Sequence, residues 1–310
     1  MAELILLLIG GLIALFVGGE LLVRGSSSLA ISVGLTPLVV GLTVVAFGTS
    51  SPELVVSIQA ALKGNSAISI GNVVGSNIAN IALILGLSAI IKPVTVQSDA
   101  VMREIPFMIF ISVIFSILVY FRHIAFLSGF LFISLLILYI VVSIYISKKS
   151  NHNELGDPVK VKYSTFISIL FVLIGLIGLA FGSDLFIDGS VRLAKILGAS
   201  EFLIGLTVVA VGTSLPELVT SIVASIKKES DILVGNIVGS NIFNILAIIG
   251  IAAMITSINL SEVNLVDLFV MLFFSVIIFP MSIFNKLISR RKGLFLLIGY
   301  VLYILYLVNS

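Results

Sequence analysis

GTSSPELVVS, at residues 48–57, and GTSLPELVTS, at residues 212–221, are two copies of one motif, and each lies inside a long apolar stretch. Both copies place a glutamate, Glu53 or Glu217, directly after a proline, a residue that interrupts helical hydrogen bonding. A carboxylate at the centre of a bilayer costs at least ~2.5–3 kcal/mol on insertion scales, so such a residue usually has a function or a partner. The alternative is a permanently protonated glutamic acid bonded to neighbouring hydroxyls. A symmetric pair with the same polar neighbours favours a functional site.

The composition predicts an integral membrane protein. Of the 310 residues, 59% are hydrophobic and only 10% are charged, whereas a soluble domain usually carries about 25% charged residues. The absence of cysteine excludes a disulfide framework and a cysteine-based metal site, and a net charge of +2 is too small to indicate a nucleic-acid partner. The first apolar run lacks the basic flank of a signal peptide, so we interpret it as a transmembrane helix with the lipid bilayer as its partner.

Ten apolar runs are long enough to cross the ~30 Å hydrocarbon layer. They cover residues 3–23, 35–62, 67–91, 105–121, 124–146, 164–187, 199–226, 231–256, 265–284 and 293–308. One sizeable polar connection, residues 147–163, predicts a cytoplasmic linker between a first five-helix repeat, 1–146, and a second, 164–310.

The two halves of the chain are related in sequence. Residues 41–86 align without a gap on 205–250 at a constant offset of 164, and 30 of the 46 pairs are identical. The match extends upstream, where GGELLVRGS at 18–26 faces GSDLFIDGS at 182–190. An odd number of spans per repeat makes the second repeat enter the membrane from the opposite side. The expected fold is therefore all-α, with two inverted-topology five-helix repeats and interrupted helices at the midplane, where such transporters bind their substrates.

The basic residues predict the orientation of the chain in the membrane. If the N-terminus is outside, 13 of the 17 Lys and Arg residues fall in inward-facing connections. The outward-facing ones are Lys63, Arg122, Arg192 and Lys195. We therefore expect a multi-pass protein of the cell membrane with both termini outside.

The prolines also predict oxygen atoms that could serve as ligands. Pro52 and Pro216 should release carbonyls near Ala46–Thr49 and Ala210–Thr213 from helical bonding. A released carbonyl in a bilayer needs another partner, and a cation is a suitable one. Thr49 and Ser50 should share a helical face with Glu53, because they precede it by four and three residues.

A second pair of spans contributes a polar stripe. The stripe in the first half is Asn72, Ser76 and Asn80, and the one in the second half is Asn236, Ser240 and Asn244. Each stripe includes a G-x-x-x-G pattern, which lets helices approach closely. An all-oxygen site with two carboxylates suits Ca²⁺ or Na⁺ better than Mg²⁺, which dehydrates reluctantly.

These motifs resemble the paired α-repeats of the sodium/calcium exchanger family, within the wider group of cation/calcium antiporters. The resemblance rests on the two decapeptides together with GNVVGSNIANI at 71–81 and GNIVGSNIFNI at 235–245. It implies a secondary antiporter of the prokaryotic type that exchanges Na⁺ for Ca²⁺ by alternating access, with no cofactor besides the transported ions. The large regulatory region of animal exchangers is absent, because the linker is far too short to contain it.

The resemblance also implies roles for individual residues. Calcium would be bound by Glu53, Glu217, Thr49 and Thr213, the two glutamates acting as the metal carboxylates. Sodium would be bound by Ala46, Thr49, Ser50, Glu53, Ser76, Ala210, Thr213, Ser214, Glu217 and Ser240. Asn80 and Asn244 would line the central site. Potassium-dependent exchangers have an aspartate where Asn244 stands, so the exchange is expected to be independent of K⁺. The resemblance also implies additional Na⁺ ions in flanking sites, which would make the exchange electrogenic.

Three other functions stay open from the sequence. Proton/calcium exchange is one, since a buried glutamate readily takes a proton, and a cation channel with a continuous pore is another. An enzyme would use Ser50 or Ser214 as nucleophile, but neither has a membrane-embedded His or Lys to activate it. Outside the motifs, Glu20 and Asp184 lie near the ends of the first and sixth spans and are expected to be interfacial rather than ligands.

Overall fold

The computed structural model describes residues 2–64, 66–122, 124–153, 163–196, 210–256 and 264–309. The helices of the first half are α1 Ala2–Ser32, α2 Pro37–Val40, η1 Gly41–Val45, α3 Ala46–Thr49, α4 Ser51–Leu62, α5 Ser66–Ile78, η2 Ala79–Leu85, α6 Gly86–Ile91, η3 Ala100–Glu104, α7 Ile105–Tyr120 and α8 Phe126–Asn153. Those of the second half are α9 Thr165–Ile196, α11 Ala210–Thr213, α12 Leu215–Lys227, α13 Ser230–Phe243, η5 Asn244–Ile249, α14 Gly250–Ile255, α15 Leu265–Ile283 and α16 Arg290–Asn309. The elements labelled η are π-helical.

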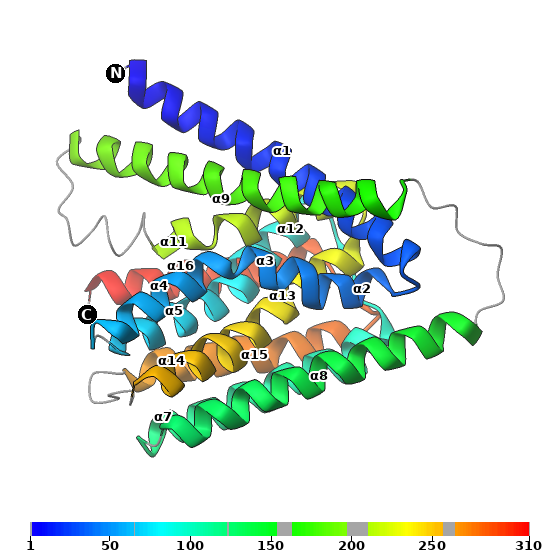
Figure 1. Ribbon diagram of the computed structural model, residues 1–310. Helices are drawn as coiled ribbons and strands as arrows, with labels where there is room; N and C mark the ends of the chain where they lie inside the picture. The colour runs from blue at the N-terminus through cyan, green and yellow to red at the C-terminus, as the bar shows by residue number, and fades with distance from the viewer. Residues whose placement is uncertain are drawn as a thin grey trace.

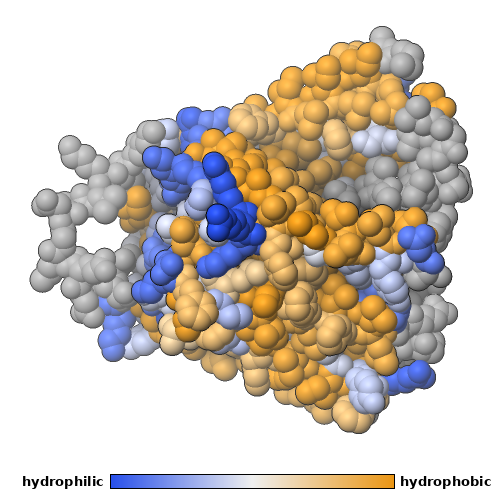
Figure 2. Space-filling model, turned by 180° about the vertical axis from the view of Figure 1, so that it is seen from behind, coloured by the Kyte–Doolittle hydropathy of each residue, from blue (hydrophilic) through white to orange (hydrophobic). Residues whose placement is uncertain are grey.

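The protein is a helical membrane protein, as the composition predicted. Within the described residues, eight helices are long and apolar enough to cross a membrane, or nine if the bent pair Pro37–Thr49 and Ser51–Leu62 is one span. The predicted span 199–226 lies partly outside these residues. Apolar side chains form a broad band across the middle of the surface in Figure 2, and hydrophilic ones gather toward its two ends.

Several helix ends differ from the predicted ones. Helices α1 and α9 continue to Ser32 and Ile196, beyond the predicted residues 23 and 187, and α8 continues to Asn153, into the predicted linker. The predicted ends of the first and sixth spans fall directly before charged residues, Arg24 and Asp188. A helix does not have to stop there, because its backbone hydrogen bonds are as well satisfied in the interface as in the lipid.

Helices α1 and α9 form a pair along one side of the molecule, at the top of Figure 1. They run antiparallel, and their backbones touch at glycines. A Cβ atom on Gly11 would lie 2.8 Å from the backbone nitrogen of Phe186, and one on Gly18 would lie 2.8 Å from that of Leu179. Such distances leave no room for a side chain, so glycine permits this contact. The two helices therefore form one closely packed unit.

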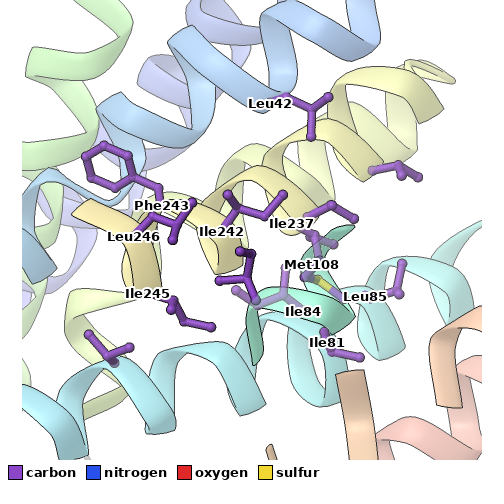
Figure 3. Packing of buried hydrophobic residues seen from close by; sticks show 14 of the residues in the cluster. Leu42, Ile81, Ile84, Leu85, Met108, Ile237, Ile242, Phe243, Ile245 and Leu246 are labelled. Atoms are coloured by element: carbon purple, nitrogen blue, oxygen red, sulfur yellow. The ribbon is translucent and has the colours of Figure 1, made fainter. Parts of the chain in front are cut away.

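The remaining helices pack around α13, which is buried along its length. Figure 3 shows its side chains Ile237 and Ile242 near Ile84 of η2 and Met108 of α7. Its glycines lie against the bent helix of the first half. A Cβ atom on Gly235 would come within 2.5 Å of the carbonyl oxygen of Leu38, so only glycine fits here. The predicted close approach is thus confirmed for the second G-x-x-x-G pattern. It is wrong for the first, since no atom lies within 4 Å of a Cβ position on Gly71 or Gly75.

Two short strands were not predicted. Val94–Thr95 (β1) pairs antiparallel with Leu287–Ile288 (β2). The strands join the connection after α6 to the connection after α15, which lie far apart in sequence. At the other end of the molecule, the N- and C-termini both lie on the left of Figure 1. We refer to that side as the terminal side and to the opposite one as the linker side.

Candidate cation-binding site

The two motifs interrupt their helices in the same way. Ser50 separates α3 from α4 with φ −83° and ψ 7°, and the two segments meet at 49°. Ser214 separates α11 from α12 with nearly the same dihedral angles, φ −88° and ψ 8°. Each glutamate therefore lies in the first turn of the second segment. The partial positive charge of a helix N-terminus favours a carboxylate at that position.

Each glutamate is held by a serine from the other half of the chain. Ser50 Oγ donates a hydrogen bond to Glu217 Oε1 at 2.8 Å, and Ser214 Oγ donates one to Glu53 Oε1 at 3.2 Å. Both glutamates are 1% exposed. Ser50 thus bonds to the glutamate of the other motif rather than to Glu53 of its own. The helix break turns the serine toward the other repeat.

The second carboxylate oxygen of each glutamate has no hydrogen-bond donor among the described residues. Eight buried side-chain oxygens lack a partner among the described residues, and five of them belong to predicted site residues: Glu53 Oε2, Glu217 Oε2, Asn80 Oδ1, Asn244 Oδ1 and Ser240 Oγ. The two carboxylate and two amide oxygens form symmetric pairs at the repeat offset of 164. Burying such an oxygen without a partner costs about 1–3 kcal/mol. Oxygens without donors, gathered in symmetric pairs, are what a cation would coordinate.

The two amide oxygens are oriented by a second pair of asparagines. Asn80 Nδ2 donates to Asn241 Oδ1 at 2.9 Å, and Asn244 Nδ2 donates to Asn77 Oδ1 at 3.0 Å. Because the nitrogen of each amide is engaged, its oxygen is left facing the other way. The sequence reasoning did not assign Asn77 or Asn241 to the site. The signal was present, since both belong to the repeated G-S-N sequence.

Asn80 and Asn244 also occupy equivalent irregular segments. Each lies at the start of a π-helical segment, η2 or η5. Wider helical turns of this kind are found mostly at functional sites, where they displace a side chain from its regular position. The hydrophobic periodicity of the sequence does not reveal them.

The outer members of the two polar stripes have a structural role. Asn72 Nδ2 donates to the backbone carbonyl of Glu53 at 3.1 Å, and to Ser57 Oγ at 2.9 Å. Asn236 Nδ2 makes the equivalent bond to Ser221 Oγ at 3.1 Å. These amides fasten the glutamate-bearing helices to the next span.

The backbone carbonyls are less free than the prolines predicted. The carbonyl of Ala46 accepts the backbone N–H of Ser50 at 3.0 Å, and the hydroxyl of Thr49 at 3.4 Å. This bond survives because the helix breaks only after Ser50. The carbonyl of Gly212, which Pro216 cannot bond, accepts Ser183 Oγ at 2.9 Å. The expected release of the carbonyls is therefore wrong for Ala46, and at Gly212 the partner is a serine.

The remaining predicted residues surround the same centre. Ser214 Oγ lies 3.4 Å from Ser76 Oγ, and Thr49 Oγ1 donates to Asn236 Oδ1 at 3.0 Å. Thr213 is buried beside Ser214, and Ala210 begins α11. The structure thus brings the predicted residues of both motifs together between the two repeats.

A cavity of about 460 Å³ reaches this region from the surface. One wall is α9, and the other is formed by the two interrupted helices. The lining includes Pro52, Val56, Ser183, Asp184, Thr213 and Pro216. We call it the access cavity.

The sequence matches the sodium/calcium exchanger protein family twice, over residues 3–145 and 167–309. The chain belongs to this family. Sodium/calcium exchanger proteins are transporters, so the enzymatic alternative with Ser50 or Ser214 as nucleophile is excluded.

Relatives that match over most of the chain support its place in the exchanger family. The chain is 32% identical to the sodium/calcium exchanger MaX1 of Methanosarcina acetivorans, covering 97% of both proteins. It is 34% identical to the inner membrane protein YrbG of Escherichia coli, over 81% of this chain and 79% of that protein.

A solved structure of the sodium-calcium exchanger NCX_Mj is similar over 99% of both chains, with a TM-score of 0.87 and 30% identity. Structures of NCX_Mj have been obtained after soaking with Na⁺, Ca²⁺ or Sr²⁺. The chain corresponds to MaX1 and NCX_Mj over nearly the whole length of each.

Proposed function

We propose that the protein is a secondary antiporter that exchanges Na⁺ for Ca²⁺ through the site between Glu53 and Glu217. The observation that carries the proposal is the set of four buried oxygens without donors, one from each glutamate and one each from Asn80 and Asn244. Each has a symmetry-related counterpart in the other half of the chain. Membership of the exchanger family supports the same conclusion.

The oxygens available match the needs of calcium. Ca²⁺ takes 6–8 oxygen ligands, and carboxylates that bind through both oxygens, together with two amide oxygens, approach that number before any backbone carbonyl is added. Among the described residues, no group of three or more His, Cys, Asp or Glu side chains could hold a metal. The charge on the site is therefore that of two carboxylates, which one Ca²⁺ or two Na⁺ would balance.

Competition between the two ions for these carboxylates would couple their movement. Additional Na⁺ in flanking sites, near Ser50 and Ser76 in one half and Ser214 and Ser240 in the other, would make the exchange electrogenic. The architecture we propose is ten spans in two inverted repeats, 1–146 and 164–310, with alternating access of the site to the two sides of the membrane.

Asn244 bears on the choice of coupling ion. It donates to Asn77 Oδ1 through its own Nδ2, as a carboxylate could not. A neutral side chain here leaves no third charge to hold K⁺ beside the other ions. We therefore propose exchange without a K⁺ requirement, and hydroxyls arranged around both glutamates favour Na⁺ over H⁺ as the coupling ion.

The test is ⁴⁵Ca²⁺ uptake into proteoliposomes loaded with Na⁺, in K⁺-free medium. Uptake should follow the outward Na⁺ gradient, and a pH gradient of equal driving force should produce little. Uptake that follows pH and ignores Na⁺ would establish proton/calcium exchange instead. Uptake that appears only after K⁺ is added would overturn the argument from Asn244. Uptake that needs no gradient of any counter-ion would indicate a channel.

A further inference from the structure

The inverted repeats contain two equivalent acid–lysine pairs, of which one forms an ion pair and the other does not. Lys227 Nζ, at the end of α12, lies 2.9 Å from Glu20 Oε1 on α1. At the repeat offset of 164, the equivalent residues are Lys63, which follows α4, and Asp184 on α9. Neither Lys63 nor Asp184 forms an ion pair within the described part of the chain. The chain thus contains the same acid–lysine pair twice, once joined and once apart.

The packing of the helices shows the same asymmetry. Helix α1 lies directly against α12, since a Cβ atom on Gly19 would come 3.1 Å from Val219 and 3.5 Å from Val223. On the equivalent face of the second half, the access cavity separates α9 from α4. Asp184 lines one wall of that cavity, and Val56 lines the other. The joined pair therefore lies where the helices are in contact, and the separated pair where they are apart.

We infer that Glu20–Lys227 and Asp184–Lys63 are two alternating gates of the transporter, an inference that rests on the proposed antiport function. In the conformation described here, the first pair joins α1 to the end of α12, and the access cavity separates α9 from α4. In the opposite conformation, α9 moves against α4, Asp184 pairs with Lys63, and Glu20 separates from Lys227. Both acids lie on the tightly packed α1–α9 unit, so one movement of that unit exchanges the two pairs.

The other charged groups near these pairs do not repeat between the halves. Arg24 also pairs with Glu20, but its equivalent is Asp188, which pairs with Arg192 on its own helix. Ser27 Oγ donates to Glu229 Oε2 at 3.2 Å and adds one more bond to the closed side. Only the acid–lysine pair is common to both halves, as an alternating gate requires.

The strength of the joined pair suits a gate that must open in every cycle. The side chains of Lys227 and Glu20 are 26% and 30% exposed. Ion pairs with this much exposure change an equilibrium by a factor of roughly two to five.

The chain has no cysteine, so cross-linking can test the two gates directly. The first variant is Glu20→Cys with Lys227→Cys, and the second is Lys63→Cys with Asp184→Cys. Both are treated in proteoliposomes with a short bifunctional thiol reagent that a reductant cleaves. Each cross-link should form, and each should stop ion flux until the reductant is added. In the variant with all four cysteines, no molecule should carry both cross-links.

A charge substitution at the first gate should change cross-linking at the second. Adding Glu20→Gln to the Lys63→Cys, Asp184→Cys variant should raise its cross-linking rate about two- to five-fold, because the opposite conformation becomes more populated. Glu20→Asp, which keeps a carboxylate for Lys227 and Arg24, should leave the rate close to the original. Glu3→Gln is the matched control. It removes an ion pair with Arg192, at 2.9 Å, that joins α1 to α9 rather than to α12, and it should leave the rate unchanged.

The inference is overturned if Lys63→Cys and Asp184→Cys fail to cross-link under conditions that cross-link the Glu20–Lys227 positions. It is also overturned if both cross-links occur in one molecule, or if Glu20→Gln and Glu3→Gln give the same rate. Failure of the proposed Na⁺/Ca²⁺ exchange would instead be seen as absent Na⁺-driven ⁴⁵Ca²⁺ uptake in the unsubstituted chain. The two failures are therefore distinguishable.

Discussion

At the scale of single residues, the two oxygens of each site glutamate have different surroundings. Oε1 accepts a hydroxyl, from Ser214 at Glu53 and from Ser50 at Glu217. Oε2 has no donor among the described residues. The serine fixes the orientation of the carboxylate, and the second oxygen stays available. Such orientation in advance reduces the entropy lost on binding a ligand.

Replacing either glutamate with glutamine should abolish Ca²⁺ transport. Glu53→Gln and Glu217→Gln keep the shape of the side chain but remove one of the two charges, so Ca²⁺ affinity should fall by about 100-fold or more. Glu104→Gln is the matched control, because Glu104 is fully buried as well but bonds to Tyr139 at 2.5 Å. Calcium binding to purified protein and uptake into proteoliposomes measure both effects. Near-normal uptake by either site variant would contradict the two-carboxylate site.

Asn77 and Asn241 should act through the amides that they orient. Asn77→Leu removes the acceptor for Asn244 Nδ2 and should weaken Ca²⁺ binding roughly ten-fold or more, the effect of losing one buried hydrogen bond. Asn77→Asp keeps an acceptor in the same place and should lose less. Isothermal titration of both variants with Ca²⁺, alongside their thermal unfolding, separates orientation of the site from general stability. Equal loss of affinity in the two variants would argue against this role.

Those features of the site that depend on neighbouring residues in the sequence were predictable. Glu53 and Glu217 stand out because a membrane charge is costly, and Pro52 and Pro216 predict the helix breaks beside them. The crossing of the serine hydrogen bonds was not predictable, because it depends on how the two breaks face each other in space. The same holds for the carbonyl of Ala46, whose partner depends on which residue the break follows.

At the scale of helices, the contact between α1 and α9 depends on backbone atoms meeting where side chains are absent. Close contact over several turns allows dispersion forces to accumulate, which is the main source of helix association in lipid. We call this contact, which includes Gly11, Gly18 and Gly25 of α1, the α1–α9 seam. Its length favours movement of the two helices as one unit. The sequence contained the glycines, but nothing in one helix shows which other helix it touches.

A methyl group placed on this seam should destabilise the protein. Gly18→Ala would put a Cβ atom 2.8 Å from the backbone of Leu179 and should cost roughly 1–3 kcal/mol. Gly10→Ala is the control on the same helix, since no atom lies within 4 Å of its Cβ position, and it should be neutral or stabilise by about 0.5–1 kcal/mol. Thermal unfolding in detergent, followed by circular dichroism, measures both. Equal unfolding temperatures of the Gly18→Ala and Gly10→Ala variants would contradict close backbone contact between α1 and α9.

At the scale of the whole molecule, the repeat followed from the sequence, and the family matches the chain twice. The count of ten spans stays a prediction, since the described residues contain eight or nine candidates. The 164-residue offset relates Glu53 to Glu217 and predicts a site between the halves. Equivalent sequences nevertheless have unequal surroundings, as Asp184 beside an open cavity and Glu20 in an ion pair show. Pattern analysis treats the halves as equal and therefore cannot predict which of the two acid–lysine pairs is formed.

The orientation in the membrane is testable with single cysteines. Lys149→Cys, at the end of α8, should react with impermeant thiol reagents from the cytoplasmic side only, because 13 of the 17 basic residues belong to connections on that side. Asn309→Cys, at the end of α16, should react from outside only. Labelling of intact cells and of inverted vesicles gives the comparison. The reverse pattern would overturn the orientation and leave the site unaffected.

The crossed serine–glutamate bonds also have an evolutionary consequence. A duplicated gene normally frees its two copies to diverge, but here each copy holds the carboxylate of the other. A substitution at Ser50 removes a hydrogen bond from Glu217, 167 residues later, rather than from the glutamate three positions away. Selection therefore acts on pairs that join the halves, and neither half can change its share of the site without a matching change in its partner.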